Sequence, residues 1–202
     1  LTTLSLPKLA TIDAMNIEDN TGFTALSLSS VTQVGATTIH DSPEITSVAL
    51  PALTTTTGAI ILEDNTALSS FDISSLSTLG GALTISNNDA LTSLDLGGWV
   101  TVGDYDLTLS YNSALATVDL SNLVSLGGTI DIAGAQPASL DFPLTEHLGG
   151  IDIGYWEVVT LDFPKLKTLG ALSDGSYYNN GTLTTFNAPE LTTVTTSLTL
   201  KS

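Results

Sequence analysis

Hydrophobic residues recur along this chain in a pattern that repeats about every two dozen residues. The clearest copy, at residues 83–96, reads L-x-I-x-x-N-x-x-L-x-x-L-x-L. Alignment on L-x-x-L-x-L gives nine units, 21 to 25 residues apart, which begin at Leu1, Phe23, Ile45, Leu68, Leu91, Leu115, Pro137, Val158 and Leu183. This spacing is typical of leucine-rich and β-helical repeats, in which each unit packs on its neighbours.

Each unit contains two short segments in which apolar and other residues alternate. Leu94 and Leu96 represent the first segment, and Leu107 and Leu109 represent the second. A period of two indicates a strand with one buried face, and the abundant Thr, Val and Ile residues favour strands. No stretch has the 3.6-residue period of a helix. The sequence therefore predicts an all-β fold, a parallel β-solenoid of about nine coils with two or three sheets along its axis.

Glycine pairs separate the two segments in several units. We expect them to form tight bends with positive φ, which glycine adopts easily; the pairs are Gly80-Gly81, Gly127-Gly128 and Gly149-Gly150. Trp99 occupies a position that is otherwise apolar, and we expect it in the core. Residues 1–202 are expected to form a single solenoid domain. Because the chain starts without methionine and stops inside the repeat pattern, we expect it to be a fragment of a longer surface protein.

The repeat resembles those of receptor L-domain proteins, and is similar to the leucine-rich-repeat-like β-helices of fungal cell-wall GPI proteins and bacterial surface proteins. The resemblance covers essentially the whole chain. The best-matching positions are Leu83, Ile85, Asn88, Leu91, Leu94 and Leu96, and Leu62, Asn65, Leu68, Phe71 and Ile73. It implies an extracellular or cell-surface location and a role in adhesion, wall integrity or ligand recognition.

The charge balance restricts the partners. The chain has 21 acidic residues, four lysines and no arginine, for a net charge of −17. Such a surface repels phosphate backbones, so nucleic-acid binding is not expected. The absence of cysteine excludes disulfides and thiolate metal sites. No apolar run is long enough to span a bilayer, so direct membrane insertion is not expected.

One polar position of the repeat carries a row of asparagines. A stacked side-chain amide can both donate and accept, and can satisfy backbone groups that the turns bury. We interpret the row as a structural ladder, formed by Asn20, Asn65, Asn88, Asn112 and Asn180, with Ser42 substituting in the second unit.

A second row carries carboxylates on the outward side of the first strand of each unit. Its members are Asp72, Asp95, Asp119, Asp141 and Asp162. Stacked like charges repel one another. Ca²⁺ or another hard cation would relieve this repulsion, as would a cationic partner. The alternative is a solvated acidic face that keeps the solenoid soluble. Calcium is the one cofactor that the sequence suggests.

Aromatic and acidic residues concentrate together in the fifth to eighth units. Aromatic rings stack on the C–H faces of sugars, and carboxylates accept hydrogen bonds from their hydroxyl groups, so we expect a glycan or protein to bind here. The candidate ligand-binding residues are Tyr111, Tyr155, Trp156, Tyr178, Asp131 and Asp152. The structural alternative is that these side chains only shield one side of the solenoid.

Catalytic motifs are absent from the sequence. No Ser/His/Asp spacing involves either histidine, His40 or His147, and no phosphate loop or nucleotide fingerprint occurs. Asp131 and Asp152, on adjacent coils, could supply paired carboxylates for glycoside hydrolysis, but strand neighbours on an exposed face rarely form a cleft. We do not expect an enzyme.

These observations predict a non-catalytic extracellular structural or adhesion module that binds a glycan or protein along a rigid solenoid face. The alternative is a filament or surface-layer subunit, because open solenoid ends offer unpaired strands for end-to-end stacking. Two further alternatives are ice binding, suggested by the threonines in residues 54–57 and 192–196, and a polysaccharide-active enzyme.

Overall fold

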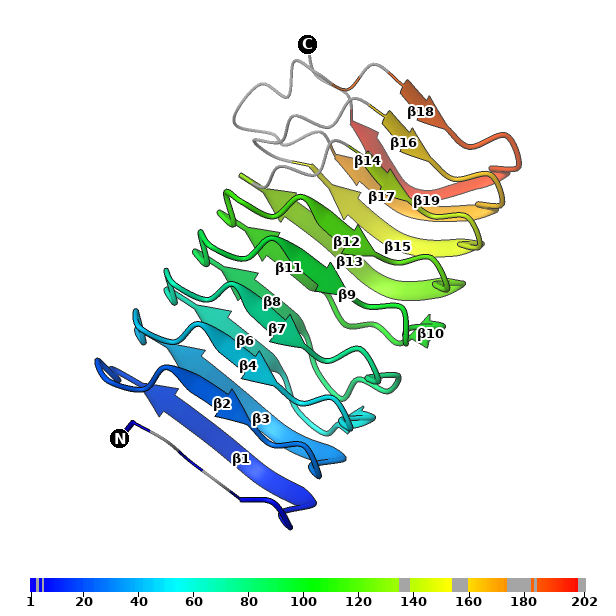
Figure 1. The fold of residues 1–202 in the computed structure, drawn as a ribbon. Coiled ribbons are helices and arrows are strands. Elements are labelled where there is room, and N and C mark those ends of the chain that lie inside the picture. Colours follow the sequence, from blue (N-terminus) through cyan, green and yellow to red (C-terminus); the bar gives the residue numbers. More distant parts are fainter. Residues whose placement is uncertain are drawn as a thin grey trace.

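The computed structural model describes residues 1–2, 4, 6–134, 139–153, 160–173, 183 and 185–199. These residues contain nineteen strands and no helix, and every strand pairing is parallel. Successive coils stack along one axis (Figure 1). The predicted parallel β-solenoid is therefore confirmed. The described residues make about seven turns, slightly fewer than the nine coils expected.

One continuous sheet, the long sheet, runs the length of the solenoid. It has eleven strands. Nine follow one another along the axis: β1 (Thr11–Glu18), β3 (Gln33–His40), β6 (Ile60–Glu63), β8 (Leu83–Ser86), β11 (Leu107–Ser110), β13 (Ser125–Ala133), β15 (His147–Asp152), β17 (Thr168–Ser173) and β19 (Thr193–Thr199). Two short strands join at the side, β5 (Thr55–Thr56) on β3 and β10 (Thr101–Val102) on β13.

Three-residue strands form the opposite side, called here the short-strand face. They belong to three separate sheets: β2 (Ala25–Ser27), β4 (Ser47–Ala49) and β7 (Ser70–Asp72); β9 (Ser93–Asp95) and β12 (Thr117–Asp119); and β14 (Ser139–Asp141), β16 (Thr160–Asp162) and β18 (Thr185–Asn187). Strand pairing is therefore interrupted between β7 and β9 and again between β12 and β14. The second interruption positions the candidate site.

The core lies between the two sides and forms one continuous cluster. Alternation explains it, because Leu94 on β9 and Leu107 and Leu109 on β11 point inward and are buried. Trp99 is also buried, as its place in the repeat predicts. Phe142 and Phe163 stack with ring centroids 4.5 Å apart, so one repeat position becomes a column of rings along the axis.

The L-x-x-L spacing marks a turn. In the turn that follows each of β7 and β9, the N–H of the later apolar residue donates to the carbonyl oxygen three positions earlier, from Leu76 to Ile73 and from Trp99 to Leu96. The same bond recurs in the turn after the asparagine ladder, from Leu91 to Asn88. The apolar residues at both ends of such a turn point into the core, which fixes the corners of each coil.

The glycine pairs have a different role from the predicted one. None of them has positive φ; Gly134 is the only described glycine that does. They lie instead where neighbouring coils approach closely. A Cβ on Gly149 would lie 1.8 Å from the carbonyl oxygen of Gly127, and one on Gly128 would lie 2.2 Å from that of Tyr105. Glycine is required at these two positions because a Cβ would overlap with backbone atoms of the neighbouring coil.

Candidate binding site

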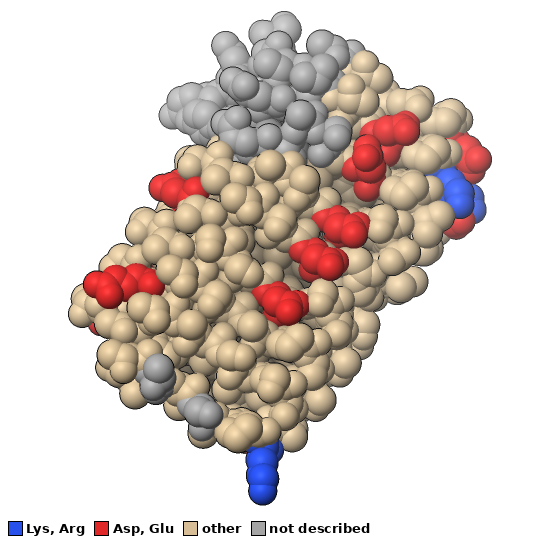
Figure 2. Space-filling model, in the orientation of Figure 1, with Lys and Arg blue, Asp and Glu red and all other residues tan. Residues whose placement is uncertain are grey.

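The predicted aspartates form an outward row on the short-strand face, called here the acidic row. Figure 2 shows acidic side chains in line along this face, within a surface that is otherwise mostly uncharged. The strand registers align Asp95 with Asp119, and Asp141 with Asp162, on paired strands. The row is therefore a real feature of the surface.

The first three carboxylates of the acidic row are used by the fold. Oδ1 of Asp72 accepts from the backbone N–H and the hydroxyl of Ser74, at 3.2 and 2.8 Å. Asp95 accepts from the N–H of Gly97 at 2.8 Å, and Asp119 from that of Ser121 at 2.9 Å. Each aspartate thus closes an Asx turn two residues ahead of itself, at the bend that follows the strand.

Proline prevents this turn at the other two positions. Pro143 and Pro164 stand two residues after Asp141 and Asp162, and proline has no N–H to donate. Asp141 forms no hydrogen bond within the described residues. Asp162 accepts instead from the side-chain amide of Asn187 on β18, at 2.6 Å. The acidic row is therefore chemically divided, and its last two carboxylates are not needed to shape a turn.

A groove of about 690 Å³, called here the acidic groove, lies where pairing stops between β12 and β14. The carboxylates of Asp119, Asp141 and Asp162 line it, together with Val118, Phe142 and both prolines. Val118 is only partly buried, whereas the equivalent residues on neighbouring strands, Leu94 and Leu140, are buried. The interruption in the sheet therefore exposes apolar surface between carboxylates. A smaller hollow of about 240 Å³ adjoins it over β9 and β12.

Hydrogen bonding favours the ionised form of one groove carboxylate, that of Asp119. The hydroxyl and then the backbone N–H of Ser121 lower the pKa of Asp119 below its ordinary value. No three acidic or histidine side chains in the described part of the chain come close enough together to hold one metal ion. The predicted metal residues thus form a line of separate charges. Such a line suits an extended cationic partner better than a single Ca²⁺, which takes six to eight oxygens.

The predicted ligand-binding patch is only partly described. Tyr155, Trp156 and Tyr178 lie outside the described residues, as does Asn180 of the asparagine row. Tyr111 follows β11 directly, and the residue is 54% exposed. Tyr105, at the other end of the same strand, is also exposed.

Asp131 and Asp152 are brought together, because they are register partners on β13 and β15. Burial raises the pKa of Asp131, and the carboxylates of Asp152 and Asp106 raise it further. Oδ1 of Asp152 is buried and has no hydrogen-bond partner among the described residues. These two carboxylates are therefore less accessible to water than those of the acidic row, and they lie on the opposite side of the solenoid.

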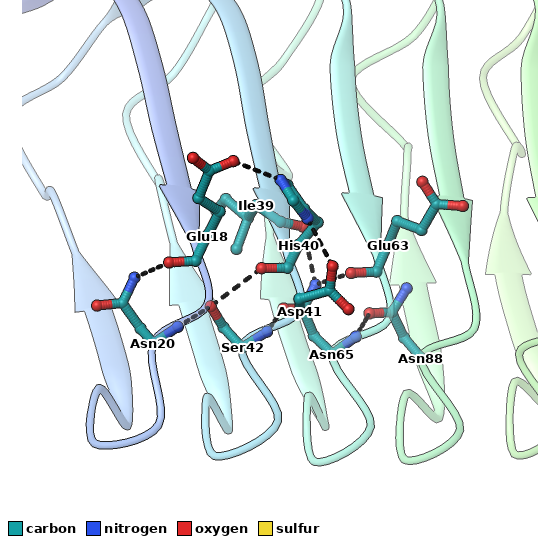
Figure 3. A network of polar contacts seen from close by, with 9 residues as sticks. All are labelled: Glu18, Asn20, Ile39, His40, Asp41, Ser42, Glu63, Asn65 and Asn88. Carbon is teal, nitrogen blue, oxygen red and sulfur yellow. Dashed lines mark hydrogen bonds and ion pairs between the residues drawn. The ribbon is translucent and has the colours of Figure 1, made fainter.

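The asparagine ladder links consecutive turns (Figure 3). The backbone N–H of one member donates to the side-chain oxygen of the next. These bonds run from Asn20 to Ser42 at 3.3 Å, from Ser42 to Asn65 at 3.2 Å, from Asn65 to Asn88 at 3.3 Å, and from Asn88 to Asn112 at 3.0 Å. Asn65, Asn88 and Asn112 are fully buried.

One ionic cluster was not foreseen from the sequence. The imidazole of His40 lies between two carboxylates, with Nε2 2.8 Å from Glu18 and Nδ1 2.9 Å from Asp41 (Figure 3). Asp41, and then Glu18, raise the pKa of His40. The signal was present, since Glu18 and His40 are 22 residues apart, one repeat period. The cluster ties the first described coil to the second.

No protein-family model, curated protein or solved structure significantly matches this chain. None of the described residues forms a helix with the length and hydropathy of a membrane-spanning segment.

Proposed function

We propose that this chain is a non-catalytic binding module that holds a protein partner on its short-strand face through basic side chains of that partner. The observation that carries the proposal is the acidic groove, where Asp141 and Asp162 stand beside exposed apolar surface without closing a turn. A rigid solenoid presents these groups in fixed positions, which limits the entropy lost on binding.

The chemistry of the groove matches a lysine or arginine side chain. Such a side chain lays its apolar stem on hydrophobic surface and keeps its charged head at the polar rim. Val118 and Pro143 offer the apolar contact, while Asp141 and Asp162 offer charged acceptors. The net charge of −17 adds a long-range field that attracts cationic partners and accelerates their encounter.

The proposal also includes the location at which the protein acts. The repeat resembles those of receptor L-domain proteins and of leucine-rich-repeat-like β-helices on fungal and bacterial surfaces. This resemblance supports an extracellular or cell-surface adhesion module. An acidic face also suits an extended contact there, in which several weak sites along one axis act together.

Calorimetric titration with a short acetylated peptide of alternating glycine and lysine tests the proposal. The groove variant combines Asp141→Asn and Asp162→Asn. The control combines Asp64→Asn and Asp72→Asn, which removes the same amount of charge outside the groove. Asparagine at position 72 can still accept the turn hydrogen bond from Ser74. Asparagine at position 64 tolerates the positive φ of 58° found there. We expect the groove variant to lose about tenfold in affinity, roughly 1.4 kcal/mol, and the control less than about twofold. Equal losses would show that only the general field attracts the peptide.

A second candidate function is end-to-end association of this chain. Val194 and Leu198 on β19 are 39% and 59% exposed, and they line an apolar hollow of about 420 Å³ with Phe186 and Leu191. β19 pairs only with β17 among the described strands. Light scattering tests this candidate, because Leu198→Glu should reduce the particle mass if copies stack on this surface. A monomer at all concentrations would contradict it.

A further inference from the structure

One turn shape recurs directly after the long strands and places a residue in the left-handed region. In the described chain the residues with positive φ are Asp19 (53°), Asp41 (50°), Asp64 (58°), Asn87 (55°), Tyr111 (54°) and Gly134 (62°). Aspartate, asparagine and glycine adopt this region at the lowest cost, whereas a bulky side chain there is a genuine outlier. Five of the six residues follow this rule, and Tyr111 does not.

No hydrogen bond of the Tyr111 side chain to the described residues compensates for the strain. Tyr111 is 54% exposed, and its hydroxyl forms no hydrogen bond within the described residues. The backbone N–H of Tyr111 donates to the carbonyl oxygen of Ala133 at 2.6 Å, but any residue except proline would make that bond. The hydrogen bonds among the described residues therefore give no reason for an aromatic ring at this position.

Gly134 in the next coil leaves room for the ring of Tyr111. A Cβ at Gly134, which occupies the same turn position one coil later, would lie 3.0 Å from Cδ1 of Tyr111. Glycine leaves the space that the ring occupies, and the ring lies against the backbone of the next turn. Its orientation is therefore restricted, although most of its surface is in solvent. A fixed, exposed aromatic face is what a stacking contact needs.

We infer that Tyr111 is a stacking platform for a pyranose ring of a flat, β-linked glycan. Strained residues persist at binding sites where the surrounding structure enforces them, so an outlier of this kind points to function. Asn87 occupies the same turn position in the preceding coil, and its side-chain amide makes no hydrogen bond within the described residues. Coils are spaced about 4.7–4.9 Å apart, so a glycan along the axis meets the ring of Tyr111 and the free amide of Asn87 together.

This site is separate from the acidic groove in residues and in ligand chemistry. Stacking uses the apolar C–H face of the sugar, and the amide of Asn87 can both donate to and accept from its hydroxyl groups. Neither contact requires a charged ligand. The inference therefore does not rest on the proposed protein partner, and either can fail without the other.

Titration with cellohexaose, followed by NMR on the ring protons of Tyr111, tests the inference. The probe should shift these signals in the wild-type chain, whereas maltohexaose, which is curved by its α-linkages, should shift them much less. Tyr111→Phe keeps the stacking face and should retain the affinity within about twofold. Tyr111→Asn should lose at least about tenfold in affinity. It should also melt about 2–4 °C higher, the shift expected for relief of a single strained residue in a chain of this size.

Melting curves of the variants show directly that they are folded. Three results overturn the inference: no response to cellohexaose, an equal response to maltohexaose, or undiminished cellohexaose binding by Tyr111→Asn. Loss of binding in Tyr111→Phe contradicts stacking as the mode of contact. If Tyr111→Asn melts no higher than the wild type, the strain argument is wrong.

Discussion

The side-chain oxygen of Asn112 accepts a hydrogen bond from the backbone N–H of Asn88, at 3.0 Å, across the gap between two coils. The amide nitrogen of Asn88 in turn donates to the carbonyl oxygens of Leu62 and Ser86, at 3.1 and 2.8 Å. A single buried side chain thus satisfies polar groups of two coils. The turns are therefore held together by side chains where the strands have already ended.

Asn88→Ala should lower the free energy of unfolding by about 2–4 kcal/mol, because it leaves the N–H of Asn65 and the carbonyl oxygen of Leu62 buried without these partners. Urea unfolding measures the loss. Asn122→Ala is the control, since Asn122 makes one exposed bond to the carbonyl of Gly97, and should cost less than about 1 kcal/mol. Similar losses for both variants would refute a special role for the ladder.

Gly149→Ala should destabilise the chain by about 3 kcal/mol or more, because the new Cβ would lie 1.8 Å from the carbonyl oxygen of Gly127 and backbone cannot yield easily. Gly22→Ala is the matched control, since no atom lies within 4 Å of a Cβ placed there. That variant should change stability by less than about 1 kcal/mol. A tolerated alanine at position 149 would contradict the described approach of the two coils.

Asp119→Ala and Asp141→Ala should differ in stability, although both remove one carboxylate of the acidic row. The first loses the turn bond from Ser121 and should cost about 0.5–1 kcal/mol at neutral pH; the second loses no bond to any described residue. Because the pKa of Asp119 is lowered, its contribution is present above the ordinary aspartate pKa and is lost as the pH falls through the lowered value. Thermal melts at neutral and acidic pH check both statements.

His40→Gln should change how stability depends on pH. The raised pKa of His40 gives a contribution that is complete below about pH 6.5 and disappears as the pH rises through the raised value. The lowered pKa of Glu18 gives one that is complete above about pH 4.5 and disappears as the pH falls through the lowered value. The wild type should therefore exceed the variant most between pH 4.5 and 6.5.

NMR titration of the His40 ring checks the cause of this dependence. Two carboxylates contact the ring, those of Glu18 on β1 and of Asp41 beside it, and Glu63 on β6 is the register partner of His40 on the other side. Asp41→Asn and Glu18→Gln should each lower the measured pKa of His40, because each removes a charged acceptor. An unchanged pKa in both variants would show that the cluster does not form in solution.

The fold could be predicted from the sequence because its rule is local and repeated. Alternation of residues such as Leu107 and Leu109 indicates strands, and the constant spacing places equivalent residues on neighbouring coils. The role of Gly149 could not be predicted from the sequence, since its constraint comes from the backbone of another coil. Glycine is compatible with positive φ and with close approach alike, so its identity alone does not distinguish them.

The sequence predicted the aspartates of the candidate site as a row, but it did not predict the groove. The sequence placed Asp72 and Asp162 in equivalent positions but did not reveal that strand pairing stops between β12 and β14. The sequence did show that Pro143 follows Asp141 by two residues. Because proline has no N–H, the Asp141 carboxylate cannot accept the turn hydrogen bond that the first three aspartates of the row accept. The unusual backbone conformation of Tyr111 could not be predicted from the sequence. It became evident only from the structure, in which the equivalent residues Asp64 and Asn87 also have positive φ.

The binding footprint of the glycine–lysine peptide is the most direct test of the proposed function. Amide chemical shifts of the isotope-labelled chain should move at Val118, Asp119, Asp141 and Asp162, which line the acidic groove, as the peptide is added. Signals of Asp64 and Asp72 should stay in place, and the shifts should vanish in the variant with Asp141→Asn and Asp162→Asn. Shifts spread evenly over all acidic residues, or confined to the long sheet, would contradict binding in the groove.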